Sequence, residues 1–255
     1  MIAFDFTGKA ALVTGAARGL GFAIAQALHA AGATVALNDR EADSVAAAIE
    51  RLGGGPRLLA APADLASAAG CARAVAAVAP LGRLDLLVNN AAVNVEKPIA
   101  LTDDAHWDLH LAVCLKAAFF TVQGALPLLR AARGSVVNIA SELGLHAIAD
   151  NVAYVSAKHG LVAMTRALAI ELAPAGIRVN ALCPGTLDTE LMRDCAAASP
   201  DPAAYYAAFR AYHPLGRLAS PAEIAGFVLT LATPVAAFMT GAALAIDGGS
   251  TAGRR

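Results

Sequence analysis

Short apolar runs alternate with longer, alanine-rich segments along almost all of this 255-residue chain. The runs have the length of buried strands, and the segments between them have the length and composition of helices. Strands that alternate with helices form a parallel sheet covered on both faces, because each connecting helix must bury an apolar stripe. The alternation therefore predicts an α/β fold, a doubly wound parallel sheet with helices on both faces.

The expected strands are residues 9–13, 34–38, 58–61, 84–89, 135–139, 178–183 and 243–246. The expected helices are residues 19–31, 41–52, 67–79, 104–130, 152–172 and 221–232, and Pro127 inside the fourth predicts a kink there. Residues 185–216 show no strand pattern and are expected to form a lid with a short helix. No composition shift or internal repeat divides the chain, so residues 1–255 are expected to form a single domain.

Composition narrows the function classes. Hydrophobic residues make up 58% of the chain and charged residues 15%, a balance that excludes intrinsic disorder. The 19 basic and 20 acidic residues give a net charge of −1, whereas general nucleic-acid binding needs a basic surplus.

The four cysteines lack the paired spacing of a zinc site or a disulfide framework. His106 and His110 have the spacing of a metal pair, but no third ligand is evident, so no metal is expected.

An uncharged stretch at residues 224–246 is long enough to span a bilayer. Pro234 interrupts it, and Thr233, Thr240 and Gly241 divide it into an expected helix, turn and short strand. The first six residues include an acid and no base, so they lack the pattern of a signal peptide. The sequence thus favours a cytoplasmic protein that does not bind a membrane.

The segment between the first expected strand and the first expected helix reads TGAARGLG, residues 14–21. Glycines let the backbone turn tightly and approach a pyrophosphate, and the start of a helix offers free N–H groups and a positive dipole end. A glycine pattern alone could be a tight turn, but this position in a strand–helix series is typical of a dinucleotide-binding loop. We therefore expect cofactor contacts from Gly15, Arg18, Gly19, Leu20 and Gly21.

An acid follows the second expected strand. Asp39 can accept hydrogen bonds from the adenosine ribose and repel a 2′-phosphate, which favours NAD. Arg18 and Arg40 act in the opposite direction, because an arginine near that ribose can hold the phosphate of NADP. Asp64 and Leu65 follow the third strand and are expected at the adenine edge, although Asp64 could instead cap the next helix.

Three polar residues indicate proton chemistry. Tyr154 and Lys158 share one face of an expected helix, and Ser141 follows the fifth strand, at the edge where open α/β sheets bind ligands. A free tyrosine is a poor base at neutral pH, but a nearby ammonium group lowers the pKa of the phenol. Tyr154 can then exchange a proton with an alcohol or carbonyl oxygen that Ser141 holds while hydride moves to or from a nicotinamide.

Together these features resemble the short-chain dehydrogenase/reductase family over nearly the whole chain. The motifs that carry the resemblance are residues 14–21, Asp64, residues 89–92, Ser141, Tyr154, Lys158, Pro184, Gly185, Thr189 and residues 247–249.

The resemblance implies one Rossmann domain with Ser141, Tyr154 and Lys158 as the catalytic triad. It implies that Asn90 lines the cofactor cleft, with Pro184, Gly185, Leu187 and Thr189 on the nicotinamide side, and that Tyr154 and Lys158 also contact the cofactor. It further implies homodimers or homotetramers built from the long fourth and fifth helices.

One position departs from the family pattern. Members carry an asparagine where this chain has Cys114, and that position normally holds a water linking the lysine to solvent. A thiol is a weak donor and a weak acceptor, so the proton relay is in doubt. Ala92 replaces a family glycine, a small change that we expect to be tolerated.

Polar residues near the triad bear on the substrate. Glu142, His146, Asp150 and Asn151 suggest a polyol or a sugar acid, although simple loop solvation explains them equally well. Tyr205, Tyr206, Tyr212 and His213 could contact a substrate or anchor the lid.

The expected function is an NAD(P)-dependent oxidoreductase that interconverts a secondary alcohol and a ketone, with NAD preferred. One alternative is a 3-oxoacyl thioester reductase that uses NADPH. The other is a non-catalytic dinucleotide-binding regulator that lost turnover through Cys114.

Overall fold

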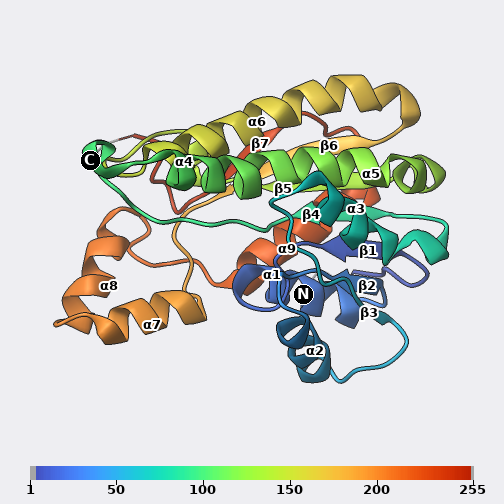
Figure 1. Cartoon of the computed structure of the whole chain (residues 1–255), viewed down its shortest axis with the longest axis horizontal. Helices are drawn as coiled ribbons and strands as arrows, with labels where there is room; N and C mark the ends of the chain where they lie inside the picture. The colour runs from blue at the N-terminus through green and yellow to red at the C-terminus, as the bar shows by residue number, and fades with distance from the viewer. Residues whose placement is uncertain (1–3, 254–255) are drawn as a thin grey trace.

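The sheet is parallel throughout and is built from strands along the entire chain. The structure, a computed structural model, describes residues 4–253 (Figure 1). Its strand order is β3-β2-β1-β4-β5-β6-β7, so the chain reverses direction across the sheet between β1 and β4. The strands are β1 (Ala10–Val13), β2 (Thr34–Leu37), β3 (Leu58–Ala60), β4 (Leu86–Asn89), β5 (Ser135–Ile139), β6 (Arg178–Pro184) and β7 (Ala243–Ile246). The predicted doubly wound α/β fold is confirmed.

Helices cover both faces of this sheet. They are α1 (Gly19–Ala30), α2 (Ala42–Arg51), α3 (Ala68–Ala76), α4 (Asp104–Leu111), α5 (Ala117–Ala132), α6 (Val152–Leu172), α7 (Glu190–Ala198), α8 (Pro202–Ala211) and α9 (Pro221–Ala232). In Figure 1, α5 and α6 lie on one side of the strands, and α1 and α9 lie on the other.

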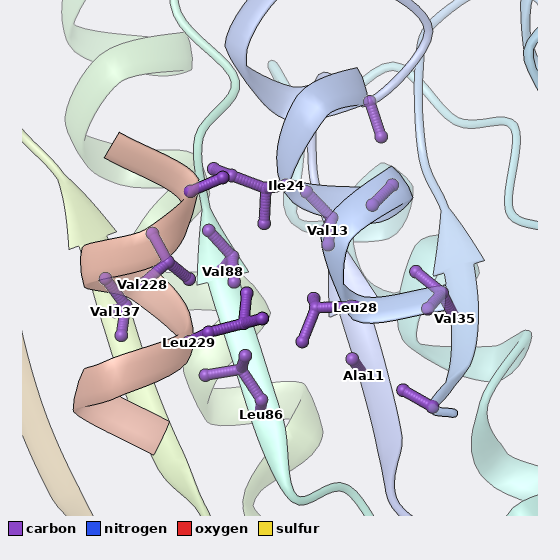
Figure 2. Close-up of a cluster of buried hydrophobic side chains, with 14 of the residues drawn as sticks. Ala11, Val13, Ile24, Leu28, Val35, Leu86, Val88, Val137, Val228 and Leu229 are labelled. Carbon is purple, nitrogen blue, oxygen red and sulfur yellow. The ribbon is translucent and has the colours of Figure 1, made fainter. Parts of the chain in front are cut away.

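Strand residues alternate between two hydrophobic clusters. Val13, Val88 and Val137 point to the face of α1 and α9, where they meet Ile24 and Val228 (Figure 2). The intervening residues, such as Leu12 and Leu87, belong to the cluster under α3, α5 and α6. This period of two follows from strand geometry, and each fully buried Leu or Ile contributes about 1.5–3 kcal/mol. A sheet buried on both faces therefore holds the carboxyl ends of its strands in fixed positions.

Two of the expected helices differ in the structure. The lid contains two helices, α7 and α8, rather than one, and they project together at one end of the molecule (Figure 1). The expected helix at residues 104–130 is interrupted by a π-helical turn, Ala112–Lys116. Pro127 lies inside α5, which stays α-helical from Ala117 to Ala132. The interruption thus lies before Pro127, between α4 and α5.

Residues 224–246 form most of α9, a 3-10 turn at Pro234–Ala236 and β7, which matches the expected helix, turn and strand. Within residues 4–253, Asp104–Ala132 is the one helical segment long and apolar enough to cross a membrane. Core helices pass the same test, and this segment packs against α3 and α6. Residues 1–3, on which the signal-peptide expectation partly rests, lie outside the described residues.

Candidate active site

A cleft of roughly 640 Å³ opens beyond the carboxyl ends of β1, β2, β3 and β4. Its position is the one where open α/β sheets bind ligands, because the loops there diverge on either side of the strand reversal. Nine of the residues predicted to bind the cofactor line it: Gly15, Arg18, Gly19, Leu20, Asp39, Asp64, Leu65, Asn90 and Thr189. The volume lies within the range of ordinary ligand sites.

The glycine loop fits a dinucleotide. Gly15 has a φ of +61°, and a side chain there would place Cβ 2.9 Å from the Ala91 Cα. A Cβ on Gly21 would lie 2.1 Å from the Gly15 carbonyl oxygen, so Gly21 allows α1 to pack against the turn and does not itself line the cleft. Arg18 precedes α1 without a side-chain cap, which leaves the first N–H groups of the helix for a phosphate.

Asn90 supports this loop from β4. Its amide nitrogen donates to the carbonyl oxygens of Thr14 at 2.9 Å and Gly15 at 3.1 Å. The Thr14 hydroxyl in turn accepts from the backbone N–H groups of Asn90 at 2.8 Å and Ala91 at 3.0 Å. The Asn90 side chain therefore holds the floor of the cleft.

Two acids lie at the far end of the cleft. Asp39 accepts from the N–H groups of Ala17 at 3.2 Å and Arg40 at 2.8 Å, which fixes its carboxylate beside the glycine loop. The Asp64 carboxylate accepts from Ala66 N–H at 2.9 Å. The N-cap of α3 is Ser67, so the interpretation of Asp64 as a helix cap is wrong.

Ser141, Tyr154 and Lys158 come together where β5 ends and α6 begins. Ser141 caps a 3-10 turn, Glu142–Gly144, and its hydroxyl lies close enough to the Tyr154 phenol to lower the pKa of that group. Lys158 is buried, its ammonium nitrogen donates to the Ile139 carbonyl at 2.8 Å, and it lies 5.5 Å from the centre of the Tyr154 ring. One turn of α6 separates the phenol from the amine, as the spacing predicted.

Burial governs the acidity of both groups. Desolvation raises the pKa of Tyr154, the nearby Cys114 and Glu142 add to this rise, and the hydrogen bond with Ser141 opposes it. Desolvation also lowers the pKa of Lys158. The pKa of the phenol is thus raised in the protein alone, contrary to the expectation that Lys158 lowers it, and burial is the largest cause. Tyr154 is therefore protonated at neutral pH.

Cys114 lies in the π-helical turn and holds the loop after β4. Its thiol donates to the Val93 carbonyl at 3.2 Å, and its sulfur accepts from Val93 N–H at 3.4 Å. The side chain is 1% exposed. Sequence reasoning expected only a weakened relay at this position, since no residue pattern announced the π-helical turn. The Cys114 thiol thus makes two hydrogen bonds with Val93, a residue that lines the cleft.

The nicotinamide-side residues fall into two groups. Thr189 lines the cleft and caps α7 by accepting from Met192 N–H at 3.3 Å. Pro184 ends β6, Gly185 donates its N–H to Ile246, and Leu187 pairs with Ala219. These three position the segment that leads to Thr189 and are outside the lining of the cleft, as are Ser141, Tyr154 and Lys158.

The histidine pair is structural. His110 is buried, its Nδ1 donates to the His106 carbonyl at 2.7 Å, and its Nε2 accepts from Val95 N–H at 3.2 Å. With both ring nitrogens in use, His110 has none left for a metal, and residues 4–253 contain no group of three potential ligands. Its ring packs edge-on to Tyr154, with centroids 6.5 Å apart. His110 thus forms part of the wall around the phenol.

The aromatic residues of the lid differ in their burial and contacts. His213 is 3% exposed and anchors the end of the lid to the body, whereas Tyr212 is 63% exposed. Tyr205 packs on Phe209 within α8, and Tyr206 lies under Arg210. Anchoring is therefore the role that the structure shows for His213.

Comparison with known proteins agrees with this geometry. A family model described as enoyl-(acyl carrier protein) reductase, within the short-chain dehydrogenase/reductases, matches residues 15–251. The chain is 40% identical over 255 residues to D-threitol dehydrogenase of Mycolicibacterium smegmatis, covering 97% of this chain and 95% of that protein. It is 37% identical over 253 residues to trans-4-hydroxycyclohexanecarboxylate dehydrogenase of Sinomonas cyclohexanicum, covering 96% and 93%.

Among solved structures, the RhlG/NADP active-site complex of Pseudomonas aeruginosa matches with a TM-score of 0.90 and 35% identity, covering 98% of this chain and 100% of that one. The chain therefore belongs to the short-chain dehydrogenase/reductase family, and it is an oxidoreductase that interconverts an alcohol and a ketone with a nicotinamide dinucleotide.

Proposed function

We propose that this enzyme uses NAD and acts on a secondary alcohol of a small, uncharged polyol, with Ser141, Tyr154 and Lys158 as its catalytic residues. The observation that carries the choice of NAD is the fixed carboxylate of Asp39 at the end of β2. A 2′-phosphate on the adenosine ribose would meet this negative charge, whereas free ribose hydroxyls would donate to it.

The arginine beside Asp39 supports the same choice. Arg40 donates to the Glu41 carboxylate at 2.8 Å, so its guanidinium already has an acidic partner. Arg18 also lines the cleft and is a candidate phosphate ligand. The Pseudomonas aeruginosa neighbour was solved with NADP, and the preference must therefore come from this chain's own residues.

Dissociation constants for NADH and NADPH test the preference directly. We expect NADH to bind at least about tenfold more tightly, and Asp39→Ala to reduce that ratio because Arg18 and Arg40 stay while the repulsion is lost. Asp43→Ala, an exposed acid on α2, is the matched control. Tighter NADPH binding by the unmutated protein would overturn the assignment.

The chain's own residues divide the chemistry at the site. When bound, the nicotinamide accepts or donates the hydride. Ser141 donates a hydrogen bond to the reacting oxygen, and the Tyr154 hydroxyl exchanges a proton with the same atom. Ile139 fixes the amine of Lys158, whose remaining N–H groups would be available to hold the cofactor ribose. His110 packs edge-on to the Tyr154 ring, and Cys114 holds the loop after β4.

Charge near the triad supports an uncharged substrate. The Glu142 carboxylate raises the pKa of Tyr154, so its field reaches the reacting phenol, and a substrate carboxylate bound there would be repelled. Asn151, one turn before Tyr154, is 3% exposed, and both atoms of its amide lack a partner among the described residues. A polyol hydroxyl satisfies such a group without bringing charge.

A substrate panel tests this proposal. We expect a higher kcat/KM on a four-carbon polyol than on the matching sugar acid or on a 3-oxoacyl thioester. Faster reduction of the thioester with NADPH would favour the fatty-acyl alternative. Binding of the cofactor with no turnover on any alcohol or ketone would favour the non-catalytic regulator.

We also propose a homodimer or homotetramer in the cytoplasm, associated through the α4–α5 segment and α6, which correspond to the fourth and fifth helices expected from the sequence. Phe119 on α5 and Ile170 on α6 expose apolar surface there, at 39% and 79%, and the four unpaired cysteines fit a reducing compartment. Light scattering on the purified protein gives the state, and Phe119→Glu should shift it toward monomer.

A further inference from the structure

The turn that carries Ser141 is held between two walls. The Ser141 hydroxyl oxygen accepts from Leu143 N–H at 3.1 Å, so the orientation of this side chain depends on the 3-10 turn itself. On one side the turn packs on α6, where a Cβ at Gly144 would lie 2.9 Å from the Lys158 carbonyl oxygen. That close contact ties the turn to the backbone of a catalytic residue.

Residues 247–251 contact the other side of the turn. Glu142, the first residue of the turn, turns its carboxylate away from solvent, with 12% of the side chain exposed. Its Oε2 accepts a hydrogen bond from the Ser250 hydroxyl. It also lies 3.9 Å from the His146 Nε2 and 3.9 Å from the His213 Nδ1.

Asp247 gives the end of the chain a fixed shape. Its carboxylate accepts from Gly249 N–H at 2.9 Å, from Thr251 N–H at 2.9 Å and from the Thr251 hydroxyl at 2.5 Å. Burial alone would raise the pKa of Asp247, but these hydrogen bonds lower it. Ser250 lies inside this folded turn, with its hydroxyl 3.1 Å from Asp247 Oδ2.

His213 anchors the same turn to the lid. Its Nδ1 donates to the Asp247 carbonyl at 2.7 Å, and its Nε2 accepts from Thr186 N–H at 3.2 Å. Gly185 leaves room for this ring, since a Cβ there would lie 2.6 Å from it. A continuous set of polar contacts thus joins the loop after β6, the end of the chain and the turn of Ser141.

We infer that Glu142 is a positioning residue for Ser141, and that Ser250 holds Glu142 in place, so that residues 247–251 act on the active site through the turn of Ser141. Without the Ser250 hydroxyl, the turn keeps only its wall on α6. The Ser141 hydroxyl then spends less time in the position that binds the reacting oxygen, and small displacements of such groups cost rate. The inference rests on the proposed role of Ser141.

Ser250→Ala and Glu142→Ala test this inference in the full-length enzyme. We expect each to lower kcat about tenfold, with the cofactor dissociation constant within twofold of the unmutated value. Use of substrate deuterated at the carbinol carbon should show a larger isotope effect on kcat, because hydride transfer becomes slower relative to product release. Ser250→Thr and Glu142→Gln keep the donor and the acceptor, and should recover most of the lost rate.

Thr230→Val is the matched control, since the Thr230 hydroxyl donates to the Gly226 carbonyl within α9 at 2.9 Å. A kcat for Ser250→Ala within twofold of the control overturns the inference. The inference is also overturned if Ser250→Ala loses kcat, Ser250→Thr does not recover it, and both variants bind the cofactor more weakly. That result is expected of general misfolding. Ser141→Ala distinguishes failure of this inference from failure of the proposed function: if this variant keeps the unmutated rate, the proposed role of Ser141 is wrong.

Discussion

In the proposed function, proton transfer depends on the phenol of Tyr154. Replacing it with phenylalanine keeps the ring that packs against His110 and removes only the hydroxyl. Because a positioned acid or base contributes about a hundredfold or more to rate, we expect Tyr154→Phe to lower kcat by at least ~100-fold. Steady-state kinetics with the cofactor at saturation measure this loss, and NADH titration should show nearly unchanged binding. A variant with near-normal turnover would assign the proton transfer elsewhere.

The pKa of the same residue predicts opposite pH profiles for the two directions. Burial raises the pKa of Tyr154 above its ordinary value near 10, so the hydroxyl is protonated at neutral pH. Ketone reduction uses this protonated form and should stay constant through the neutral range. Alcohol oxidation needs the phenol to accept a proton, and its kcat/KM should rise as the pH increases from 7 to 10. Equal profiles in both directions would show that Tyr154 does not limit either step.

At the residue scale, the sequence predicted positions better than environments. Tyr154 and Lys158 had to share a helix face because they are four residues apart, and Asp39 had to lie at a strand end. The burial that raises the pKa of Tyr154 depends on residues from α4 and the π-helical turn, which are remote in sequence. The contact between Glu142 and Ser250 spans more than a hundred residues, and neither side chain belongs to a pattern that predicts it.

At the scale of elements, the π-helical turn explains how Cys114 can stand at the family's asparagine position. A π-helical turn frees backbone carbonyls for water. The Cys114 thiol still hydrogen-bonds with both the N–H and the carbonyl of Val93. We therefore expect Cys114→Asn to raise kcat by less than about tenfold, at most ~1.4 kcal/mol off the barrier. The solvent isotope effect on turnover should change little. A rescue by several orders of magnitude would show that the natural chain is catalytically impaired.

The start of α9 gives a prediction about stability. Ser220 and Glu223 form a capping box, and Arg217 pairs with the same glutamate at 2.7 Å. The hydrogen bonds from Arg217 and Ser220 lower the pKa of Glu223 to about 2. Its contribution is therefore present above the ordinary pKa of 4.5 and is lost as the pH falls toward 2. Ser220→Ala should cost about 1 kcal/mol at neutral pH, measurable by urea unfolding, with turnover unchanged.

Local patterns predicted most elements because buried strands and capped helices have short-range causes. Ser67 and Ser220 precede helices whose first N–H groups they cap, and the strands are continuous apolar runs. The π-helical turn differs, since its residues have the composition of an ordinary helix, and the contact of Cys114 with Val93 in the loop after β4 follows from no local pattern. The second lid helix begins at Pro202 after Asp201, a capping signal that was present in the sequence and was missed.

At the scale of the whole molecule, the cofactor cleft connects the two halves of the sheet. Its lining extends from Gly15 after β1 to Thr189 and Glu190 after β6, so a bound dinucleotide would contact loops on both sides of the strand reversal. These loops fold only when the sheet is formed, and the unfolded chain offers no such site. Ligand binding must therefore stabilise the whole domain.

This linkage predicts a cofactor-dependent melting temperature. A ligand at a hundred times its dissociation constant stabilises the folded state by about 2.7 kcal/mol, which corresponds to a shift of roughly 5–11 °C for a chain of this size. We expect NADH to produce such a shift in thermal unfolding, and NADPH at the same concentration to produce a smaller one because of Asp39. In Asp39→Ala the difference between the two shifts should narrow, whereas in Tyr154→Phe it should persist, since that substitution leaves the adenosine end of the cleft intact. A larger shift with NADPH than with NADH in the unmutated protein would mean that Arg18 and Arg40 determine the cofactor rather than Asp39.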